Sequence, residues 1–335
     1  MKLLELYEKT FGTRPVQQEN LAKAGSNRQY VRLTAADGTT TLGVVTPDTD
    51  ESQCFVYLAR HFRSRGLPAP EILATDENAG CYIQEDFGKE ALYDALKKGR
   101  VEGYSESDKA LLEKTIRLLA HVQVEGAVGL DWKRLTTPRH FSQRAAMFDL
   151  NYFKYMFLRT SDVPFDEERL EDDMQQMAAD LTAMDEGHDT FLYRDFQARN
   201  VMLRDGEPCL IDFQGGQRGP VYYDVASFLM QASAHYPETL RKELAACYLE
   251  ELQGLVDWAP DETTYCERLR TFMFFRTLQV LGAYGLRGRF ERKQYFLDSI
   301  PPALENLRAL IEKGAAKRYK YLEEIAMRLT LDSQS

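Results

Sequence analysis

One short segment, residues 193–214, restricts the fold of this chain more than any other part of its sequence. Two polar blocks, Tyr-Arg-Asp-Phe-Gln-Ala-Arg-Asn and Ile-Asp-Phe-Gln, flank two apolar runs. The runs Val201 to Arg204 and Cys209 to Ile211 predict two strands joined by a turn at residues 205–208 (Asp-Gly-Glu-Pro). Such a hairpin brings Asn200 opposite Asp212 at the open end of a rigid ribbon.

The side chains at this end of the hairpin suit a phosphate-transferring site. The side-chain oxygens of Asn200 and Asp212 are ligands of the kind that Mg²⁺ takes, usually together with water and substrate phosphates. Asp195, five residues before Asn200, is placed to accept a proton from a substrate hydroxyl. If the Asp-x4-Asn spacing stood by itself, an ordinary hairpin with polar caps would explain it. The preceding Arg194 and the Ile-Asp-Phe motif at a compatible distance favour a kinase site instead, because protein kinases have the same spacing.

The patterns on either side of this segment predict an α+β chain with two lobes. Before Gly88 the chain has β-forming runs and one helix, at 17–22, 29–34, 40–46, 50–66 (the helix), 71–74 and 80–84. Helical patterns dominate after Gly88, over 106–125, 138–158, 165–186, 238–254, 261–285 and 301–329. We therefore expect a protein-kinase-like fold. Residues 1–87 would form a small, β-rich N-lobe that binds nucleotide, and residues 88–335 a large, mainly helical C-lobe for catalysis and substrate binding.

The composition argues against several other classes of protein. The formal net charge of −10 argues against a nucleic-acid partner, because a phosphate backbone requires a basic footprint. Apolar runs of about 18 residues are missing and the first residues carry charges, so we expect neither a membrane span nor a signal peptide. Five scattered cysteines without C-x-x-C spacing suit reduced thiols in a cytoplasmic protein.

The two polar blocks, together with Gly-Pro-Val-Tyr-Tyr-Asp-Val-Ala-Ser at 219–227, resemble the aminoglycoside phosphotransferase/choline kinase superfamily of small-molecule kinases. The resemblance implies ATP and Mg²⁺ as cofactors, Asp195 as the catalytic base, and Asn200 and Asp212 as the Mg²⁺ ligands. Asp224, near the start of the helix that follows the hairpin, is expected either to cap that helix or to brace the catalytic loop.

A finer resemblance is to the bacterial kinases that phosphorylate N-acetylmuramate and N-acetylglucosamine at C1. Those kinases share an Arg before the catalytic-loop Asn (Arg199 here), a Gln after Ile-Asp-Phe (Gln214), and stretches similar to 276–284 and 295–301. The likeness runs from about residue 25 to residue 310.

Two positions depart from the superfamily pattern. Tyr193 stands where the catalytic loop usually has His. The third strand, Leu-Gly-Val-Val-Thr-Pro at 42–47, offers no lysine for the ATP phosphates, and the anomeric sugar kinases lack this lysine too. Arg28 and Lys23 are the candidates to replace it.

At the nucleotide end, the turn Gly25-Ser26-Asn27-Arg28 is expected to cradle phosphate oxygens with its backbone amides. A plain hairpin turn is the alternative, but similar Gly-Ser-Asn turns open the phosphate-binding loop across the superfamily. At the junction of the lobes, the backbone of Glu85 and Phe87 is expected to bind the adenine edge. An acidic linker strand is the alternative there.

At the acceptor end, the residue types distinguish between substrates. A cationic substrate requires acidic or aromatic walls, whereas an anionic or acetamido sugar requires Arg and amide groups in addition. Arg199 and Gln214 beside the transfer site fit the second type, as do Asn151 and Arg276 on two helices. Core packing or a surface ion pair is the alternative for the helical residues.

We therefore predict a phosphotransferase that moves the γ-phosphoryl group of ATP to an alcohol. The favoured acceptor is the anomeric hydroxyl of a cell-wall amino sugar, in a recycling role. Two alternatives stay open at this point. One is a kinase for another alcohol, such as an aminoglycoside, choline, ethanolamine or a different sugar, and the other is a nucleotide-binding pseudokinase with a regulatory role. The sequence leaves both a monomer and a homodimer open.

Overall fold

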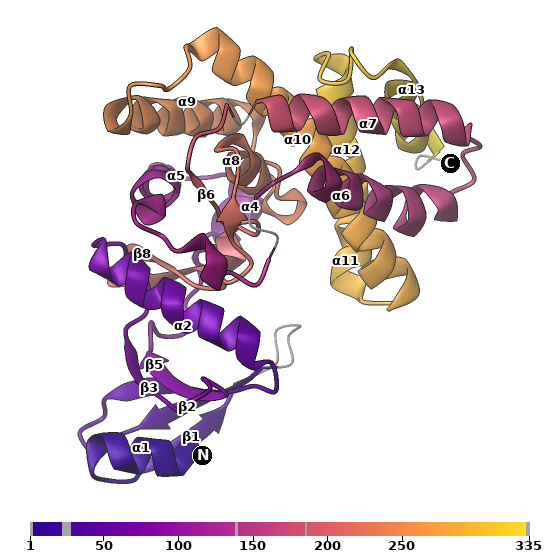
Figure 1. Cartoon of the computed structure of the whole chain (residues 1–335). Helices are drawn as coiled ribbons and strands as arrows, with labels where there is room; N and C mark the ends of the chain where they lie inside the picture. Colours follow the sequence, from indigo (N-terminus) through magenta and orange to yellow (C-terminus); the bar gives the residue numbers. More distant parts are fainter. Residues whose placement is uncertain (1–2, 22–27, 138–139, 185, 333–335) are drawn as a thin grey trace.

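The computed structural model describes residues 3–21, 28–137, 140–184 and 186–332 and has two lobes of different secondary structure. The smaller lobe carries a five-stranded sheet, and the larger lobe is built mainly from helices (Figure 1). The expected two-lobed α+β fold is therefore confirmed.

The sheet of the N-lobe is antiparallel, with strand order β1-β2-β3-β5-β4. Its strands are β1 (Gln17–Asn20), β2 (Gln29–Thr34), β3 (Thr40–Val45), β4 (Ile72–Thr75) and β5 (Cys81–Glu85). The predicted strands agree with these bounds to within about two residues, and the end of the first, residue 22, lies outside the described part. Helix α1 (Leu3–Phe11) packs its apolar side on one face of the sheet, around Leu6, Tyr7 and Leu33.

Helix α2 (Thr49–Ser64) lies on the other side of the sheet, towards the C-lobe (Figure 1). Its first turn is capped by Asp48, whose carboxylate accepts a hydrogen bond from the Glu51 amide at 3.0 Å. Phe55 and Phe62 of this helix join one continuous hydrophobic cluster that includes Val44 of the sheet and many C-lobe residues. The two lobes therefore share a core through α2.

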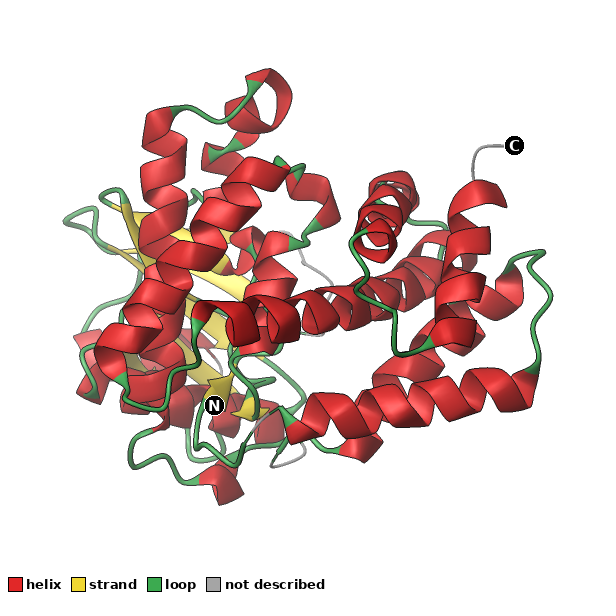
Figure 2. Ribbon diagram, turned by 90° about the horizontal axis from the view of Figure 1, so that it is seen from above, coloured by secondary structure: helices red, strands yellow, loops and turns green. Residues whose placement is uncertain are grey.

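The C-lobe consists mainly of helices, several of which extend well away from the strands (Figure 2). Its longer helices are α5 (Glu106–Val124), α6 (Gln143–Met156), α7 (Glu167–Ala183), α8 (Tyr222–Leu229), α9 (Glu238–Leu255), α10 (Glu262–Tyr284), α12 (Ile300–Glu312) and α13 (Lys320–Asp332). Shorter elements are α3 (Leu92–Ala95), α4 (Lys97–Glu102), α11 (Gln294–Asp298), and the strand pairs β6 (Phe191–Leu192) with β9 (Gln217–Arg218) and β7 (Val201–Arg204) with β8 (Glu207–Leu210).

Three sequence-based expectations about these elements are wrong in detail. The single helix expected over 301–329 is two helices, because Gly314 takes a left-handed conformation (φ +78°) just after α12 and stops it. Helix α6 begins only at Gln143, since Ser142 caps it. The turn between β7 and β8 is confined to Asp205-Gly206, because Glu207 and Pro208 already pair in β8.

Two glycines of the C-lobe let α10 approach α6 closely. A Cβ atom at Gly282 would lie 2.8 Å from the backbone of Tyr152 and Phe153, and one at Gly285 would collide with the carbonyl oxygen of Met156. Arg276 and Gln279 of α10 line the same cleft as Asn200, the residue before the β7–β8 hairpin, which is called the catalytic hairpin below.

Strand β5 ends at Glu85 and α3 begins at Leu92, so the expected boundary between residues 87 and 88 falls in the connection between them. The hydrophobic core is continuous across this boundary. The division of the chain into two units, residues 1–87 and residues 88–335, stays a prediction. Within the described residues, no helix is both long and apolar enough to cross a membrane.

Candidate active site

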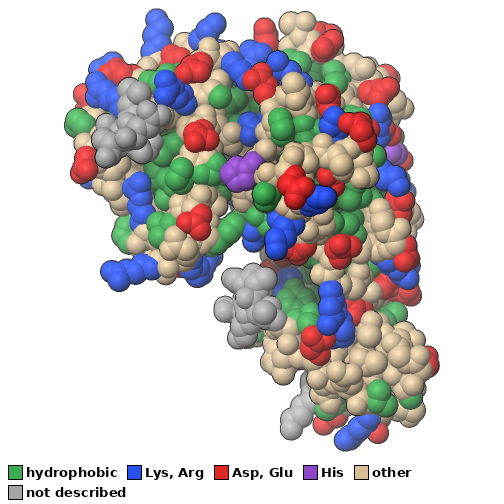
Figure 3. Space-filling model, turned by 180° about the vertical axis from the view of Figure 1, so that it is seen from behind, with side chains coloured by type: hydrophobic (Ala, Val, Ile, Leu, Met, Phe, Trp, Pro, Cys, Tyr) green, Lys and Arg blue, Asp and Glu red, His purple; other side chains and the backbone are tan. Residues whose placement is uncertain are grey.

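A deep cleft between the lobes collects most of the predicted site residues. Its volume is about 1490 Å³ and its walls come from β2, β3 and β5, the catalytic hairpin, α8, α10 and the α11 region. The view from behind shows the hollow between the sheet lobe and the helical part (Figure 3). Single-ligand pockets measure roughly 300–1000 Å³, so this cleft has room for a nucleotide and an acceptor together.

Asp195 lies on the floor of the cleft, with its carboxylate held by two amides. The Gln197 side chain donates to Oδ1 at 2.8 Å, and the Asn200 side chain donates to Oδ2 at 3.2 Å. Desolvation raises the pKa of Asp195, the nearby Arg276 opposes this shift, and Asp212 adds to it. A carboxylate with a raised pKa is a better proton acceptor than an ordinary aspartate.

Asn200 and Asp212 meet at the end of the hairpin, one residue out of the expected register. Val201 pairs with Leu210, and the Ile211 amide donates to the Asn200 carbonyl at 3.3 Å, so Ile211 lies opposite Asn200. Asp212 follows with φ +64°, an uncommon conformation for a non-glycine residue that is typical of functional sites. Asn200 and Asp212 both line the cleft.

The donor set at this end of the hairpin fits Mg²⁺. The Asn200 amide nitrogen donates to the Asp195 carbonyl at 2.9 Å, which leaves the amide oxygen as the atom that can coordinate a cation. Gln214 donates to Asp212 Oδ1 at 2.8 Å and so orients that carboxylate. Among the described residues, groups of three or more His, Cys, Asp and Glu side chains that could hold a metal are absent. Mg²⁺ needs only one or two protein ligands when substrate phosphates complete its shell.

Asp224 braces the catalytic loop. It is fully buried in the first turn of α8, and its carboxylate accepts hydrogen bonds from the backbone amides of Tyr193 at 2.7 Å and Arg194 at 2.9 Å, and from Gln123 at 3.1 Å. Of the two expected roles, these hydrogen bonds favour bracing over capping of α8. Desolvation raises the pKa of Asp224 to about 6, although these hydrogen bonds oppose the shift.

Tyr193, which replaces the usual His, ties the catalytic loop to the strand that precedes Asp212. Its buried hydroxyl donates to the Ile211 carbonyl, and its ring packs edge-on against Phe213 at 6.3 Å. Phe213 in turn stacks on Phe55 of α2, with ring centroids 4.8 Å apart and ring planes within 5° of parallel. The segment from Ile211 to Phe213 therefore contacts both the catalytic loop and α2.

Arg194 has an internal partner that sequence reasoning missed. It forms a bidentate ion pair with Asp149 of α6, with N–O distances of 3.0 and 3.2 Å, and its own backbone has φ +77°. Asp149 is a buried carboxylate. The sequence signal for this partner was the position of Asp149 between apolar residues of a helix, because a buried charge requires a partner.

At the nucleotide end, Glu85 and Phe87 line the cleft where the lobes join. The Glu85 amide donates to the Glu71 carbonyl at 2.9 Å, and its carboxylate pairs with Arg63 and Arg204. The Glu85 amide and side chain are therefore engaged, which leaves its carbonyl and the Phe87 backbone for an adenine edge. Gly25, Ser26, Asn27 and Lys23 lie outside the described residues.

At the acceptor end, Arg199 is held between two aromatic rings. Its guanidinium carbon lies 4.2 Å from the centroid of Tyr93 and 3.9 Å from that of Tyr295, both of which line the cleft. The two rings restrict the position of the guanidinium group but do not neutralise its charge. Tyr93 and Tyr295 lie far from Arg199 in sequence, so spacing could not associate them with it.

Arg276 of α10 also lines the cleft and is 6% exposed. It donates to Ser227 at 2.8 Å, to Tyr223 at 3.3 Å and to Gln279, while its Nε has no partner within the described residues. Asn151 is not among the residues that line the cleft, whereas its neighbour Tyr152 is, because one residue along a helix turns the side chain by about 100°. A role for Asn151 in acceptor binding stays a prediction.

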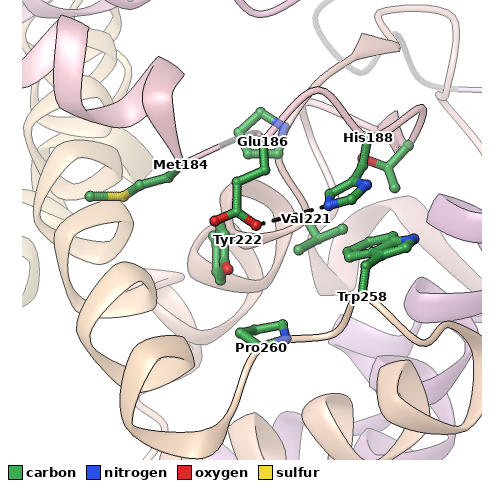
Figure 4. Close-up of a pocket in the computed structure, with 9 residues that line it drawn as sticks. Met184, Glu186, His188, Val221, Tyr222, Trp258 and Pro260 are labelled. Carbon is green, nitrogen blue, oxygen red and sulfur yellow. Dashed lines mark ion pairs between the residues drawn. The ribbon is translucent and has the colours of Figure 1, made fainter.

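A second hollow lies away from this cleft and cannot hold a substrate. Figure 4 shows it between His188, whose ring stacks on Trp258 at 3.9 Å, and Tyr222. Its volume is about 10 Å³, room for roughly one water molecule.

Comparison with known proteins agrees with this geometry. The model of the phosphotransferase enzyme family (APH) matches residues 18–262. The N-acetylmuramate/N-acetylglucosamine kinase of Neisseria meningitidis serogroup B is 25% identical over 307 residues, which cover 89% of this chain and 87% of that protein.

Solved structures with much lower identity show the same fold. The choline kinase of Cryptosporidium parvum Iowa II has a TM-score of 0.60 at 14% identity, covering 91% of this chain and 93% of its own. A thermostable mutant of an aminoglycoside phosphotransferase, in ternary complex with ADP and hygromycin B, has a TM-score of 0.55 at 16% identity, covering 94% and 99%. Because the family match includes the sheet lobe and the whole catalytic hairpin, this chain belongs to the phosphotransferase enzyme family and is a small-molecule kinase that phosphorylates a hydroxyl group.

Proposed function

We propose that this kinase transfers the γ-phosphoryl group of ATP to the anomeric hydroxyl of a cell-wall amino sugar, N-acetylmuramate or N-acetylglucosamine, with Mg²⁺ as cofactor. The lining of the cleft beside Asp195 is the observation that carries the proposal. It offers the guanidinium groups of Arg199 and Arg276 and the amide of Gln279. Such groups bind hydroxyl, acetamido and carboxylate oxygens, and two guanidinium groups in the cleft oppose a cationic acceptor such as choline or an aminoglycoside. The name of the meningococcal relative points to the same acceptors.

The chemistry would run as a direct in-line transfer. The acceptor oxygen forms a bond to the γ-phosphorus, the bond from that phosphorus to the β–γ bridging oxygen breaks, and ADP leaves. Asp195 takes the proton of the acceptor hydroxyl, and an anomeric hydroxyl gives it up more easily than an ordinary alcohol because it is more acidic. Asn200 and Asp212 would hold the cation, which supplies charge neutralisation on the phosphates.

The same proposal gives the reaction a place in the cell. A kinase for free cell-wall sugars that uses ATP would act in the cytoplasm, where ATP is available, and would return those sugars to metabolism as 1-phosphates. The acceptor arriving at this enzyme must therefore carry a free reducing end, released by a hydrolytic step.

The test is ADP release with Mg²⁺-ATP across a panel of acceptors: N-acetylmuramate, N-acetylglucosamine, plain hexoses, choline, ethanolamine and an aminoglycoside. We expect turnover with the N-acetyl sugars and loss of their reducing ends. Asp195→Asn is the control and should bind ATP while losing at least about a hundred-fold in kcat.

Turnover restricted to choline, ethanolamine or an aminoglycoside would overturn the proposed acceptor but not the kinase. ATP binding without turnover of any acceptor would favour a regulatory pseudokinase. Wild-type rates in Asp195→Asn would refute the assignment of the base.

A further inference from the structure

The cleft-facing positions of β3 carry no charge. Leu42 lines the cleft, and Val44, two residues further along the strand, is on the same face and fully buried. Val44 pairs with Tyr30 of β2 on one side and with Tyr82 of β5 on the other. In protein kinases, a lysine of the third strand contacts the ATP phosphates here and pairs with a glutamate of the following helix. This chain requires another donor at that place.

Arg28, the residue just before the neighbouring strand β2, supplies a cation. It precedes Tyr30 by two residues, is only 2% exposed, and forms an ion pair with Glu51 in the first turn of α2 at 2.8 Å. Its guanidinium carbon lies 5.5 Å from the ring centroid of Phe55, one turn further along α2. The pair therefore joins strand β2 to the same helix whose Phe55 stacks on Phe213, the residue after Asp212.

The hydroxyl of Tyr30 connects this buried cation to the cleft. Arg28 Nη1 donates to the Tyr30 oxygen at 3.4 Å, and the Tyr30 side chain lines the cleft. A tyrosine that accepts a hydrogen bond keeps its own proton available to donate. A hydroxyl polarised by a guanidinium is a stronger donor to an anion than an isolated one.

We propose that Tyr30 is the phosphate-contacting donor that replaces the missing lysine, and that Arg28, fixed by Glu51, is the residue that positions and polarises it. The proposal rests on ATP as the phosphoryl donor, as proposed above. Tyr30 would touch the nucleotide, whereas Arg28 and Glu51 would act through it.

Tyr82 provides a matched control in the same sheet. It lies across Val44 from Tyr30, is fully buried, and its hydroxyl has no hydrogen-bond partner among the described residues. Tyr82→Phe therefore removes the same group from the same ladder, but from a position away from the cleft wall.

The experiment measures dissociation constants of Mg²⁺-ATP, Mg²⁺-ADP and adenosine for the wild type and for Tyr30→Phe, Arg28→Met, Arg28→Lys, the double variant Tyr30→Phe/Arg28→Met, and Tyr82→Phe. We expect Tyr30→Phe and Arg28→Met each to weaken ATP and ADP about ten-fold while adenosine stays within about two-fold, because only the phosphates lose a partner. Arg28→Lys should restore part of the affinity. The double variant should bind ATP no more weakly than the worse single variant, because Arg28 and Tyr30 act on the phosphates through the same hydrogen bond.

Several outcomes would overturn the proposal. The proposal fails if Tyr30→Phe binds ATP with an affinity within two-fold of the wild type. It also fails if the affinity for adenosine falls as much as the affinity for ATP, because that result indicates a distorted lobe. Equal effects of Tyr82→Phe and Tyr30→Phe would also refute it. If the wild type binds no ATP at all, the proposed phosphoryl donor fails instead, and the two failures are therefore distinguishable.

Discussion

The buried carboxylate of Asp224 accepts a hydrogen bond at 2.7 Å from the backbone amide of Tyr193, two residues before Asp195. The same carboxylate holds the amide of Arg194 at 2.9 Å. A single side chain thus fixes two successive amides of the loop that carries the candidate base. We expect Asp224→Asn to lower kcat by at least about ten-fold, because an amide side chain cannot accept both hydrogen bonds with two oxygens. Steady-state kinetics at saturating ATP and acceptor tests this, and an unchanged kcat would contradict it.

Asp224 should also make stability depend on pH in a defined direction. Burial raises its pKa to about 6 in the folded protein, from an ordinary value of 3.8. Between these values the folded protein holds a proton that the unfolded chain has released, so the contribution of Asp224 to the free energy of unfolding decreases as pH rises from about 4 to about 6. Urea unfolding of the wild type, measured against Asp224→Asn over this range, should show that decrease. A difference that is constant with pH would refute the raised pKa.

Arg276 should set the acid limb of the pH–rate profile. Its charge lowers the pKa of Asp195, against the desolvation that raises it. Arg276→Met should therefore move the acid limb of kcat/KM to higher pH, because Asp195 must be ionised to accept a proton. Arg287→Met is the control, since Arg287 also lines the cleft but pairs with Glu291 at 3.2 Å. An equal shift in both variants would show that the effect is general to the cleft.

Arg199 should contribute to the affinity for the acceptor and not for the nucleotide. We expect Arg199→Met to raise KM for the acceptor about ten-fold or more, with KM for ATP within about two-fold, because a charge-assisted hydrogen bond is lost at the acceptor end. Arg100→Met is the matched control: Arg100 also contacts the Tyr93 ring, at 3.6 Å, but is not among the residues that line the cleft. Loss of acceptor affinity in Arg100→Met alone would contradict the assignment.

The contact between α6 and α10 should be intolerant of a single methyl group. Gly285→Ala places a Cβ on the Met156 carbonyl and should destabilise the protein by about 1–3 kcal/mol. Gly254→Ala, near the end of α9, meets nothing within 4 Å and should be neutral or stabilising by about 0.5 kcal/mol. Thermal unfolding of the two variants beside the wild type is the measurement. Equal melting temperatures would show that the helices can move apart without cost.

Local sequence patterns predicted the fold and the centre of the site, because the functional groups there lie within about twenty residues of one another. Asp195, Asn200 and Asp212 lie just before and just after a single hairpin, so their spacing in sequence indicated that they lie close together. The side chains that hold them in place come from distant elements: Asp149 from α6, Tyr93 from α3, and Tyr295 from α11. Their association with the site depends on how helices pack, which single-sequence periodicity does not specify.

The register error at the hairpin has a similar cause. Counting strand residues placed Asn200 opposite Asp212, but the pairing begins with Val201 and Leu210, and Asp212 has a positive φ. A sequence of ordinary polar residues gives no sign of that backbone conformation, because aspartate adopts it only where the surroundings hold it.

The ion pair between Arg194 and Asp149 has a consequence for control of the enzyme. Many protein kinases keep the arginine beside the catalytic aspartate without a partner until another enzyme phosphorylates the activation loop. Here the partner of Arg194 is an ordinary carboxylate, Asp149, so the ion pair needs no added phosphate. We therefore infer that this arginine is held in place without any modification of the chain.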